Sequence, residues 1–302
     1  MNNYAVVFPG QGSQSLNMLA PFAEYQTIVD DYCQRASNVL GYDIQALIQN
    51  GPEEKLNQTE YTQPALLVAG VIAWEIYKKN NAQKPAFFAG HSLGEYTALT
   101  CAGSIRFEDA VALVQARGQY MQSAVPVGVG AMAAIVGLDD AKIQEVCQSV
   151  GSIEDIAPAN FNSIGQVVIA GKREAIEAAI IEAKKVGAKI AVLLPMSVPS
   201  HCDLMRPAAN LLNEKLNSVT FNPPEIPVIN NVDVIIETSP EQIKAALVKQ
   251  LYSPVRWVEI IQLMRAQGVT TIIECGPGKV LAGLIKRIDK EIILQPLLEN
   301  KG

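Results

Sequence analysis

Short, continuous apolar segments alternate with amphipathic helical segments along nearly the whole chain of 302 residues. The segments 4–8 (YAVVF) and 85–90 (PAFFAG) are followed at once by turns that contain glycine. A strand that is apolar at every position is covered on both faces, which is typical of a parallel sheet between helices. The chain therefore predicts an α/β fold, with further elements at 62–79 (helix), 107–121 (helix) and 269–278 (a strand that enters a glycine turn).

The middle of the chain follows a different order. Its pattern predicts, in turn, strand 131–138, helix 140–149, strand ~155–161, strand 166–171, helix 173–185 and strand 189–195, which is the β-α-β-β-α-β order of a ferredoxin-like unit. We expect a large α/β-hydrolase-like domain with a parallel sheet core, made of residues 1–127 and 198–302. Residues 128–197 are expected to form a small inserted ferredoxin-like α+β domain. We expect a ligand site in the cleft between the large domain and the small one.

Composition and charge exclude several classes of function. The net charge is −6, so the basic surface of a nucleic-acid-binding protein is not expected. The longest apolar stretch, 65–74, is too short to span a bilayer, and the N-terminus does not resemble a signal peptide. Five scattered cysteines are typical of reduced thiols. We expect a cytoplasmic protein without membrane contact, metal or bound cofactor.

Ser92 lies in the sequence GHSLG (90–94), between a predicted strand and a predicted helix. It could be an ordinary helix cap, because Glu95 three residues later would complete a capping box. It could also be the nucleophile of a G-x-S-x-G elbow, where the glycines permit a sharp turn that exposes the hydroxyl. Helix N–H groups would then face a developing oxyanion. The strand before and the helix after favour the nucleophile.

A serine nucleophile needs a base, and the chain has two histidines. His91 adjoins Ser92, so we expect its side chain to leave the tight turn in another direction. His201 lies in the loop after the strand 189–195 and is therefore the expected base; the alternative is a helix-entry residue without chemistry. Cys202 adjoins that base and is explained more simply as a small apolar residue.

Arg117 shares one face of the helix 107–121 with apolar or small residues, and no acidic residue stands three or four positions away. A charge on such a face is costly unless it is paired. Arg117 therefore either pairs with a distant carboxylate or clamps a substrate carboxylate, which guanidinium geometry suits. The turn GQGSQ (10–14) offers backbone N–H groups at the expected edge of the sheet, whereas CGPG (275–278) is expected to be structural.

Seven motifs occur in order across nearly the whole chain: VFPGQGSQ, GHSLGEY, QARGQYMQ, NFNSIGQVVIAG, SVPSHCDLM, QLYSPVRW and ECGPGKVLAGL. Together they resemble the malonyl-CoA:acyl carrier protein transacylases of bacterial fatty-acid synthesis. The resemblance implies an acyltransferase that moves a malonyl group from malonyl-CoA to the phosphopantetheine thiol of acyl carrier protein. The transfer would be ping-pong, through a malonyl-serine intermediate. Malonyl-CoA and acyl carrier protein are thus the expected partners of an expected monomer.

The resemblance also implies a role for each of six residues. They are the nucleophile Ser92, the base His201, Gln250 (which orients the base through its backbone carbonyl), the oxyanion-hole residues Gln11 and Leu93, and the carboxylate clamp Arg117. Two positions depart from the family pattern: Ser200 stands where several relatives carry Phe, and Ile164 replaces an expected Pro. Both departures leave selectivity between acyl groups open.

Two other classes of function compete with this prediction. A hydrolase could also carry G-x-S-x-G, but it would normally have an acidic third member between the serine and the histidine. Asp155 is a candidate for that position, although no motif surrounds it and Arg117 would then be unexplained. A non-catalytic subunit that only docks carrier proteins could share the fold, and the complete Ser–His pair argues against it.

Overall fold

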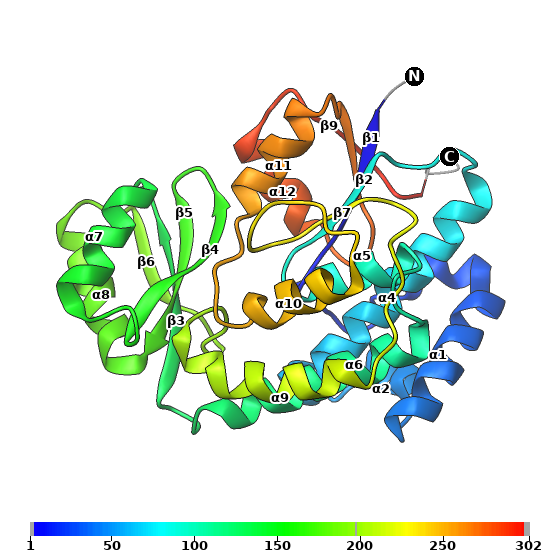
Figure 1. Ribbon diagram of the computed structural model, residues 1–302, viewed down its shortest axis with the longest axis horizontal. Coiled ribbons are helices and arrows are strands. Elements are labelled where there is room, and N and C mark those ends of the chain that lie inside the picture. The colour runs from blue at the N-terminus through cyan, green and yellow to red at the C-terminus, as the bar shows by residue number, and fades with distance from the viewer. Residues whose placement is uncertain (1–2, 197, 299–302) are drawn as a thin grey trace.

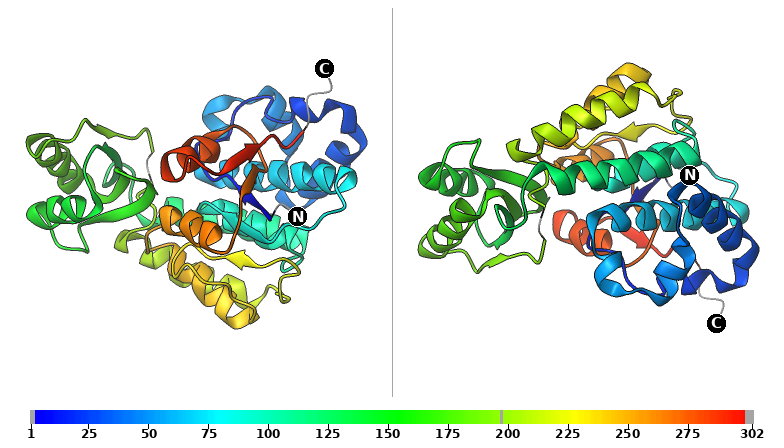
Figure 2. Two further views of the ribbon diagram at one scale, coloured as in Figure 1. Left: turned by 90° about the horizontal axis from the view of Figure 1, so that it is seen from above. Right: turned by 90° about the horizontal axis from the view of Figure 1, so that it is seen from below.

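The computed structural model describes residues 3–196 and 198–298 and contains two separate sheets (Figure 1). The first is a five-stranded parallel sheet with the order β7-β2-β1-β8-β9. The second is a four-stranded antiparallel sheet with the order β4-β5-β3-β6. It stands with two helices at one side of the molecule (Figures 1 and 2). The expected α/β class with a parallel sheet core is confirmed.

The parallel sheet is built around β1. Its strands are β1 (Tyr4–Phe8), β2 (Phe87–Gly90), β7 (Val228–Ile229), β8 (Thr271–Glu274) and β9 (Ile293–Gln295). All five residues of β1 are buried. Val6 and Phe8 pack into one hydrophobic cluster, whereas Ala5 and Val7 pack into another on the opposite face. Both faces of the strand are covered, which explains why it is apolar at every position.

Helices contribute buried residues to the hydrophobic clusters on both faces of this sheet. They are α1 (Gln26–Leu40), α2 (Ile44–Asn50), α3 (Glu53–Leu56), α4 (Thr59–Asn80), α5 (Leu93–Cys101), α6 (Phe107–Ala124), α9 (Arg206–Asn217), α10 (Pro240–Gln250), α11 (Trp257–Ala266) and α12 (Val280–Ile288), with 3-10 turns at η1 (Ala20–Tyr25) and η2 (Asp203–Met205). The expected helices near 62–79 and 107–121 are confirmed as α4 and α6. Among the described residues, no helix is long and apolar enough to cross a membrane.

The antiparallel sheet and its helices follow the expected element order. The elements are β3 (Gly130–Val136), α7 (Asp140–Val150), β4 (Ile156–Ser163), β5 (Gln166–Lys172), α8 (Arg173–Lys185) and β6 (Ile190–Leu193). The two helices bury Ile143 and Ile176 against one face of the sheet. On the other face, Met132 and Val168 pack in a cluster with Cys202. This second contact brings β4 and β5 beside the loop that carries His201.

Helices α4 and α6 approach each other at Gly118, where a side chain would not fit. A Cβ atom there would lie 2.7 Å from Glu60 Cα and 2.8 Å from Thr59 O. We expect Gly118→Ala to force the helices apart and to lower the free energy of unfolding by about 1–3 kcal/mol, as measured by urea denaturation. Gly283→Ala in α12 is the matched control, since no atom lies within 4 Å of its Cβ position. It should be neutral, or stabilising by up to about 1 kcal/mol; equal losses would contradict the steric argument.

Candidate active site

Ser92 occupies the sharp turn between β2 and α5, with backbone angles of φ +53° and ψ −109°. A residue with a side chain rarely adopts a positive φ, and such strain persists only where the surroundings hold it. The two glycines make the turn possible. A Cβ on Gly90 would lie 1.8 Å from the carbonyl carbon of Gly94, and a Cβ on Gly94 would lie 2.1 Å from Phe8 O. The turn therefore has the geometry of a nucleophile elbow.

The Ser92 hydroxyl does not cap α5, so the helix-cap alternative is wrong. No side-chain hydrogen bond caps the start of the helix. The other half of the expected capping box is also absent, because Glu95 Oε2 accepts hydrogen bonds from Asn231 N and Gln250 Nε2 instead. The strained turn directs the hydroxyl towards His201 rather than towards the helix N–H groups.

The structure brings Ser92, His201 and Gln250 together, as expected. Ser92 Oγ lies 2.8 Å from His201 Nε2, and His201 Nδ1 lies 2.8 Å from the backbone oxygen of Gln250. A carbonyl oxygen only accepts hydrogen bonds, so Nδ1 carries the proton. Nε2 is then free to accept the proton of the Ser92 hydroxyl. The His201 backbone is itself at φ +64°, and its N–H donates to Leu251 O.

Burial keeps His201 in the neutral form. Its side chain is buried, and desolvation lowers its pKa to about 3, with the positive charge of Arg117 as the second cause. A neutral imidazole is the form that can accept a proton from a hydroxyl. The site therefore favours the basic form of His201 across the physiological pH range.

The alternative triad through Asp155 is wrong. Asp155 pairs with Lys172 at 2.7 Å and accepts from Ser152 on the surface beside β5. The atom of His201 that an acidic partner would bind is already hydrogen-bonded to the Gln250 carbonyl.

The side chain of His91 leaves the turn in another direction than Ser92, as expected. Its Nε2 lies 2.7 Å from Asn162 Oδ1, and its ring packs edge-on against Trp257.

Arg117 is 1% exposed and points at Ser92. Its Nη1 donates to Gln63 Oε1 at 2.7 Å, and its Nη2 donates to Gln250 Oε1 at 3.0 Å and to Ser92 Oγ at 3.3 Å. Within the described part of the chain its Nε has no partner, and no ion pair to it is found. The expected alternative of a pair with a distant carboxylate is therefore not observed. Burial lowers its pKa.

The expected oxyanion-hole residues lie at the same edge of the sheet. Leu93 is the first residue of α5, and Gln11 belongs to the turn after β1. A Cβ on Gly10 would lie 2.3 Å from His91 O, so this turn packs directly on the elbow. In residues 3–196 and 198–298, neither backbone N–H donates a hydrogen bond. Both groups are thus available to an external acceptor.

Three further polar residues of the site were not found by sequence reasoning. Gln63 and Asn231 are fully buried, and Glu95 is 3% exposed. Burial raises the pKa of Glu95 to about 7, although hydrogen bonds from Asn231 and Gln250 oppose the rise. Gln63 could have been noticed as a polar residue in an otherwise apolar helix. The sequence around Glu95 instead predicts the second half of a capping box.

An open pocket lies beside the Ser92–His201 pair. A cavity of about 390 Å³ lies beside His201 and Cys202, between β4 and the loop at 252–254.

Of the two positions that depart from the family pattern, Ser200 is buried directly before His201, whereas Ile164 is 64% exposed in the turn between β4 and β5. Among the described residues, no group of His, Cys, Asp and Glu side chains could hold a metal ion.

Comparison with known proteins agrees with this class of site. The family described as the acyl transferase domain matches residues 5–292. The chain is 55% identical to the malonyl CoA-acyl carrier protein transacylase of Escherichia coli (strain K12) over 288 residues, which is 95% of this chain and 93% of that relative. The solved structure of the Coxiella burnetii malonyl CoA-acyl carrier protein transacylase is 51% identical, with a TM-score of 0.96 over 98% of this chain and 94% of that one. A structure of a malonyl-transacylase in complex with a type II polyketide-synthase acyl-carrier protein is 52% identical, with a TM-score of 0.95 over 97% and 95% of the two chains. The chain belongs to the acyl transferase domain family and is an acyltransferase.

The buried carboxyl group of Glu95 makes stability depend on pH. Its pKa is about 7 in the folded protein, against 4.5 ordinarily, so the folded state holds the proton more tightly. The free energy of unfolding therefore falls as the pH rises from 4.5 to 7, by up to about 3 kcal/mol at ~1.4 kcal/mol per pH unit. We expect Glu95→Gln to remove this part of the decline in urea denaturation between pH 5 and 8. An unchanged profile would contradict the assignment.

The two histidines allow a direct test of the electrostatics around Ser92. We expect neither imidazole to titrate near its ordinary pKa of about 6.5, because burial lowers both values. In Arg117→Met, the pKa of His201 should rise, since the charge of Arg117 contributes to lowering it. His91 should not change and serves as the internal control. The measurement is an NMR titration of the imidazole signals in both proteins; a wild-type His201 that titrates near 6.5 would overturn the argument.

Proposed function

We propose that this protein transfers the malonyl group from malonyl-CoA to the phosphopantetheine thiol of acyl carrier protein, and so supplies extender units for fatty-acid synthesis. The observation that carries the proposal is the buried arrangement of one hydroxyl between a base and a cation. Ser92 Oγ lies 2.8 Å from His201 Nε2 and 3.3 Å from Arg117 Nη2. The names of the relatives that match over nearly the whole chain point to the same substrates.

In the first half of the proposed reaction, His201 Nε2 takes the proton of Ser92 Oγ as the oxygen attacks the thioester carbonyl carbon. The N–H groups of Gln11 and Leu93 would stabilise the oxyanion that forms on the carbonyl oxygen. The carbon–sulfur bond then breaks, the coenzyme A thiolate takes the proton from His201, and the malonyl ester stays on Ser92. The Nδ1–H group of His201 donates to Gln250 O throughout, so the imidazole keeps its orientation.

In the second half, the carrier-protein thiol gives its proton to His201 and attacks the ester carbonyl carbon. The carbon–oxygen bond breaks, Ser92 recovers the proton from His201, and the malonyl group leaves as a thioester of the carrier. Both halves use the same base and the same oxyanion donors, which is the logic of a ping-pong transfer.

Arg117 is the proposed clamp for the free carboxylate of the malonyl group. Its present partners within the described residues include the neutral amides of Gln63 and Gln250, which stabilise the guanidinium without cancelling its charge. An anionic ligand would therefore meet a buried cation that forms no ion pair among the described residues, and in such a site the attraction is strong. An uncharged acyl group would not gain this interaction.

We also propose that residues 1–127 and 198–302 form one α/β-hydrolase-like domain and that residues 128–197 form an inserted ferredoxin-like domain. The support is the element order of the segment, its own hydrophobic cluster and the strand order of its antiparallel sheet, β4-β5-β3-β6. In that sheet β3 and β5, the first and third strands of the segment along the chain, lie at the centre. Residues 1–2, residue 197 at the boundary and residues 299–302 lie outside the described residues. A cytoplasmic location, a monomeric state and the lack of a cofactor, nucleic-acid or membrane partner stay predictions from the sequence.

The test is the intact mass of the protein after brief exposure to malonyl-CoA or acetyl-CoA, with Ser92→Ala as the control. We expect a malonyl adduct on the wild type alone, and its discharge by carrier protein that bears phosphopantetheine. Arg117→Ala should lose malonyl transfer while it keeps or gains acetyl transfer. Free malonate in place of an adduct would indicate a hydrolase. Equal loss of both acyl groups in Arg117→Ala would remove the clamp role.

A further inference from the structure

The strained backbone of Ser92 requires a partner that holds it in place. Its φ of +53° would relax if nothing in the surroundings opposed that change. The glycines on either side permit the turn but do not stabilise it, since they contribute only the absence of side chains. Both backbone polar groups of Ser92 are bound: its oxygen accepts from Gln250 Nε2 and Glu95 N, and its N–H donates to the side chain of Asn231.

The side chain of Asn231 spans the elbow. Its Oδ1 accepts the hydrogen bond of Ser92 N at 2.7 Å, and its Nδ2 donates to Gly90 O, also at 2.7 Å. One planar amide therefore joins the residue at the strained position to the last residue of the preceding strand. An amide can do this because it carries a donor and an acceptor side by side.

Asn231 is itself immobilised by backbone contacts. It is 0% exposed, its N–H donates to Glu95 Oε2 at 2.9 Å, and its oxygen accepts from Arg256 N at 3.0 Å. All four of its polar atoms thus have a partner. Because the side chain cannot move away, it can oppose the relaxation of the turn that it bridges.

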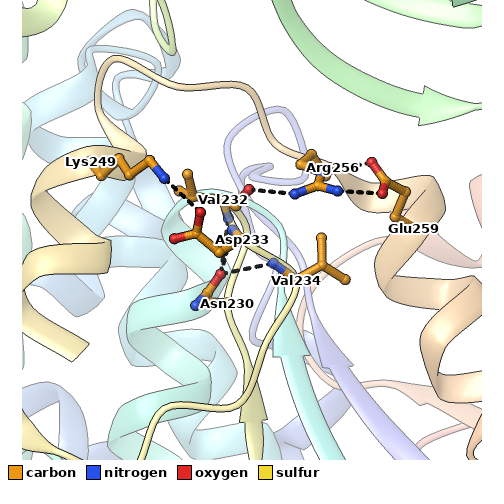
Figure 3. A network of polar contacts seen from close by, with 7 residues as sticks. All are labelled: Asn230, Val232, Asp233, Val234, Lys249, Arg256 and Glu259. Carbon is orange, nitrogen blue, oxygen red and sulfur yellow. Dashed lines mark hydrogen bonds and ion pairs between the residues drawn. The ribbon is translucent and has the colours of Figure 1, made fainter. Parts of the chain in front are cut away.

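Asn231 belongs to the loop that follows β7, and its side chain reaches the elbow from there. Figure 3 shows polar contacts of the residues on either side of it, which fix the shape of the loop. Asn230 Oδ1 accepts hydrogen bonds from the N–H groups of Val232, Asp233 and Val234. Arg256 Nη1 donates to Val232 O at 3.1 Å while its guanidinium pairs with Glu259. The Asp233–Lys249 pair at 2.6 Å lies at the solvent side, where such pairs contribute little.

We infer that Asn231 is the positioning residue of the nucleophile: it holds Ser92 in the strained conformation that aims Oγ at His201. The inference rests on the proposed role of Ser92 as the nucleophile. It also assigns the Ser92 N–H to Asn231, so this group is not a donor to the oxyanion. Asn231 touches neither the acyl group nor the base, and acts only through the backbone of the elbow.

The test compares Asn231→Ala, which loses both hydrogen bonds, with Asn231→Asp, which keeps the acceptor for Ser92 N–H and loses the donor to Gly90 O. Asp233→Ala, in the same loop, is the matched control. The readout is the rate at which a small fluorophosphonate labels Ser92, measured by intact mass, because this probe needs no acyl donor. Urea denaturation is measured in parallel, and a crystal structure of each variant gives the φ of Ser92.

We expect labelling of Asn231→Ala to be about 100-fold slower, the effect of a nucleophile displaced by about 1 Å. Labelling of Asn231→Asp should fall between that rate and the wild-type rate, and the control should stay within about two-fold of wild type. With malonyl-CoA as donor, kcat should fall while KM stays unchanged. A relaxed, negative φ at Ser92 in Asn231→Ala would complete the support.

Several outcomes would overturn the inference. One is a folded Asn231→Ala protein that labels at the wild-type rate or keeps the positive φ at Ser92. Loss of folding in both Asn231 variants would make the residue structural rather than positioning. A wild-type protein that the probe does not label at Ser92 would instead sink the proposed nucleophile, while the φ of Ser92 in the variants would still decide whether Asn231 holds the turn.

Discussion

The strained backbone at Ser92 is the constraint around which the site is arranged. A φ of +53° turns the hydroxyl away from the N–H groups of α5 and towards His201. The absence of side chains at Gly90 and Gly94 allows β2 and α5 to meet closely enough for this turn. If Ser92 relaxed to an ordinary N-cap conformation, its hydroxyl would bond to the helix and the Ser–His pair would be lost.

Burial gives the three ionisable groups around this turn different protonation behaviour. It lowers the pKa of His201, which keeps this imidazole neutral, and it raises the pKa of Glu95, which accepts hydrogen bonds from Asn231 and Gln250. Arg117 donates hydrogen bonds to the side-chain amides of Gln63 and Gln250, and among the described residues it forms no ion pair with a carboxylate. A buried cation with neutral partners is costly for folding. It is suited to an anionic ligand that arrives from outside.

The position of the site follows from the arrangement of the two sheets. Parallel strands β1 and β2 end at the same edge, so their loops bring Gln11 and Ser92 together. The antiparallel sheet packs against Cys202 on its inner face, which places β4 and β5 over the loop of His201. Neither sheet alone contains the complete arrangement, because His201 lies in a loop beside the contact between them.

The sequence by itself predicted much of the secondary structure, and it singled out Ser92 and His201 as the expected reactive pair. The spacing of apolar residues along the chain shows which face of a segment is buried, and so whether the segment is a helix or a strand. For this reason β1, β2, α4, α6 and the six elements from β3 to β6 were predictable. Ser92 was recognisable from its glycines, and the scarcity of histidine left His201 as its expected base.

Tertiary structure alone excluded the helix cap, because S-L-G-E and G-x-S-x-G share the same serine and only the folded backbone shows where its hydroxyl points. It also decided the partners of Arg117 and Asn231. Asn231 lies 139 positions from Ser92 and follows β7, a strand of only two residues. A strand so short has no periodic pattern, and the contact exists only because β7 pairs with β2. The sequence encodes which residues are buried, whereas the strand order decides which of them meet.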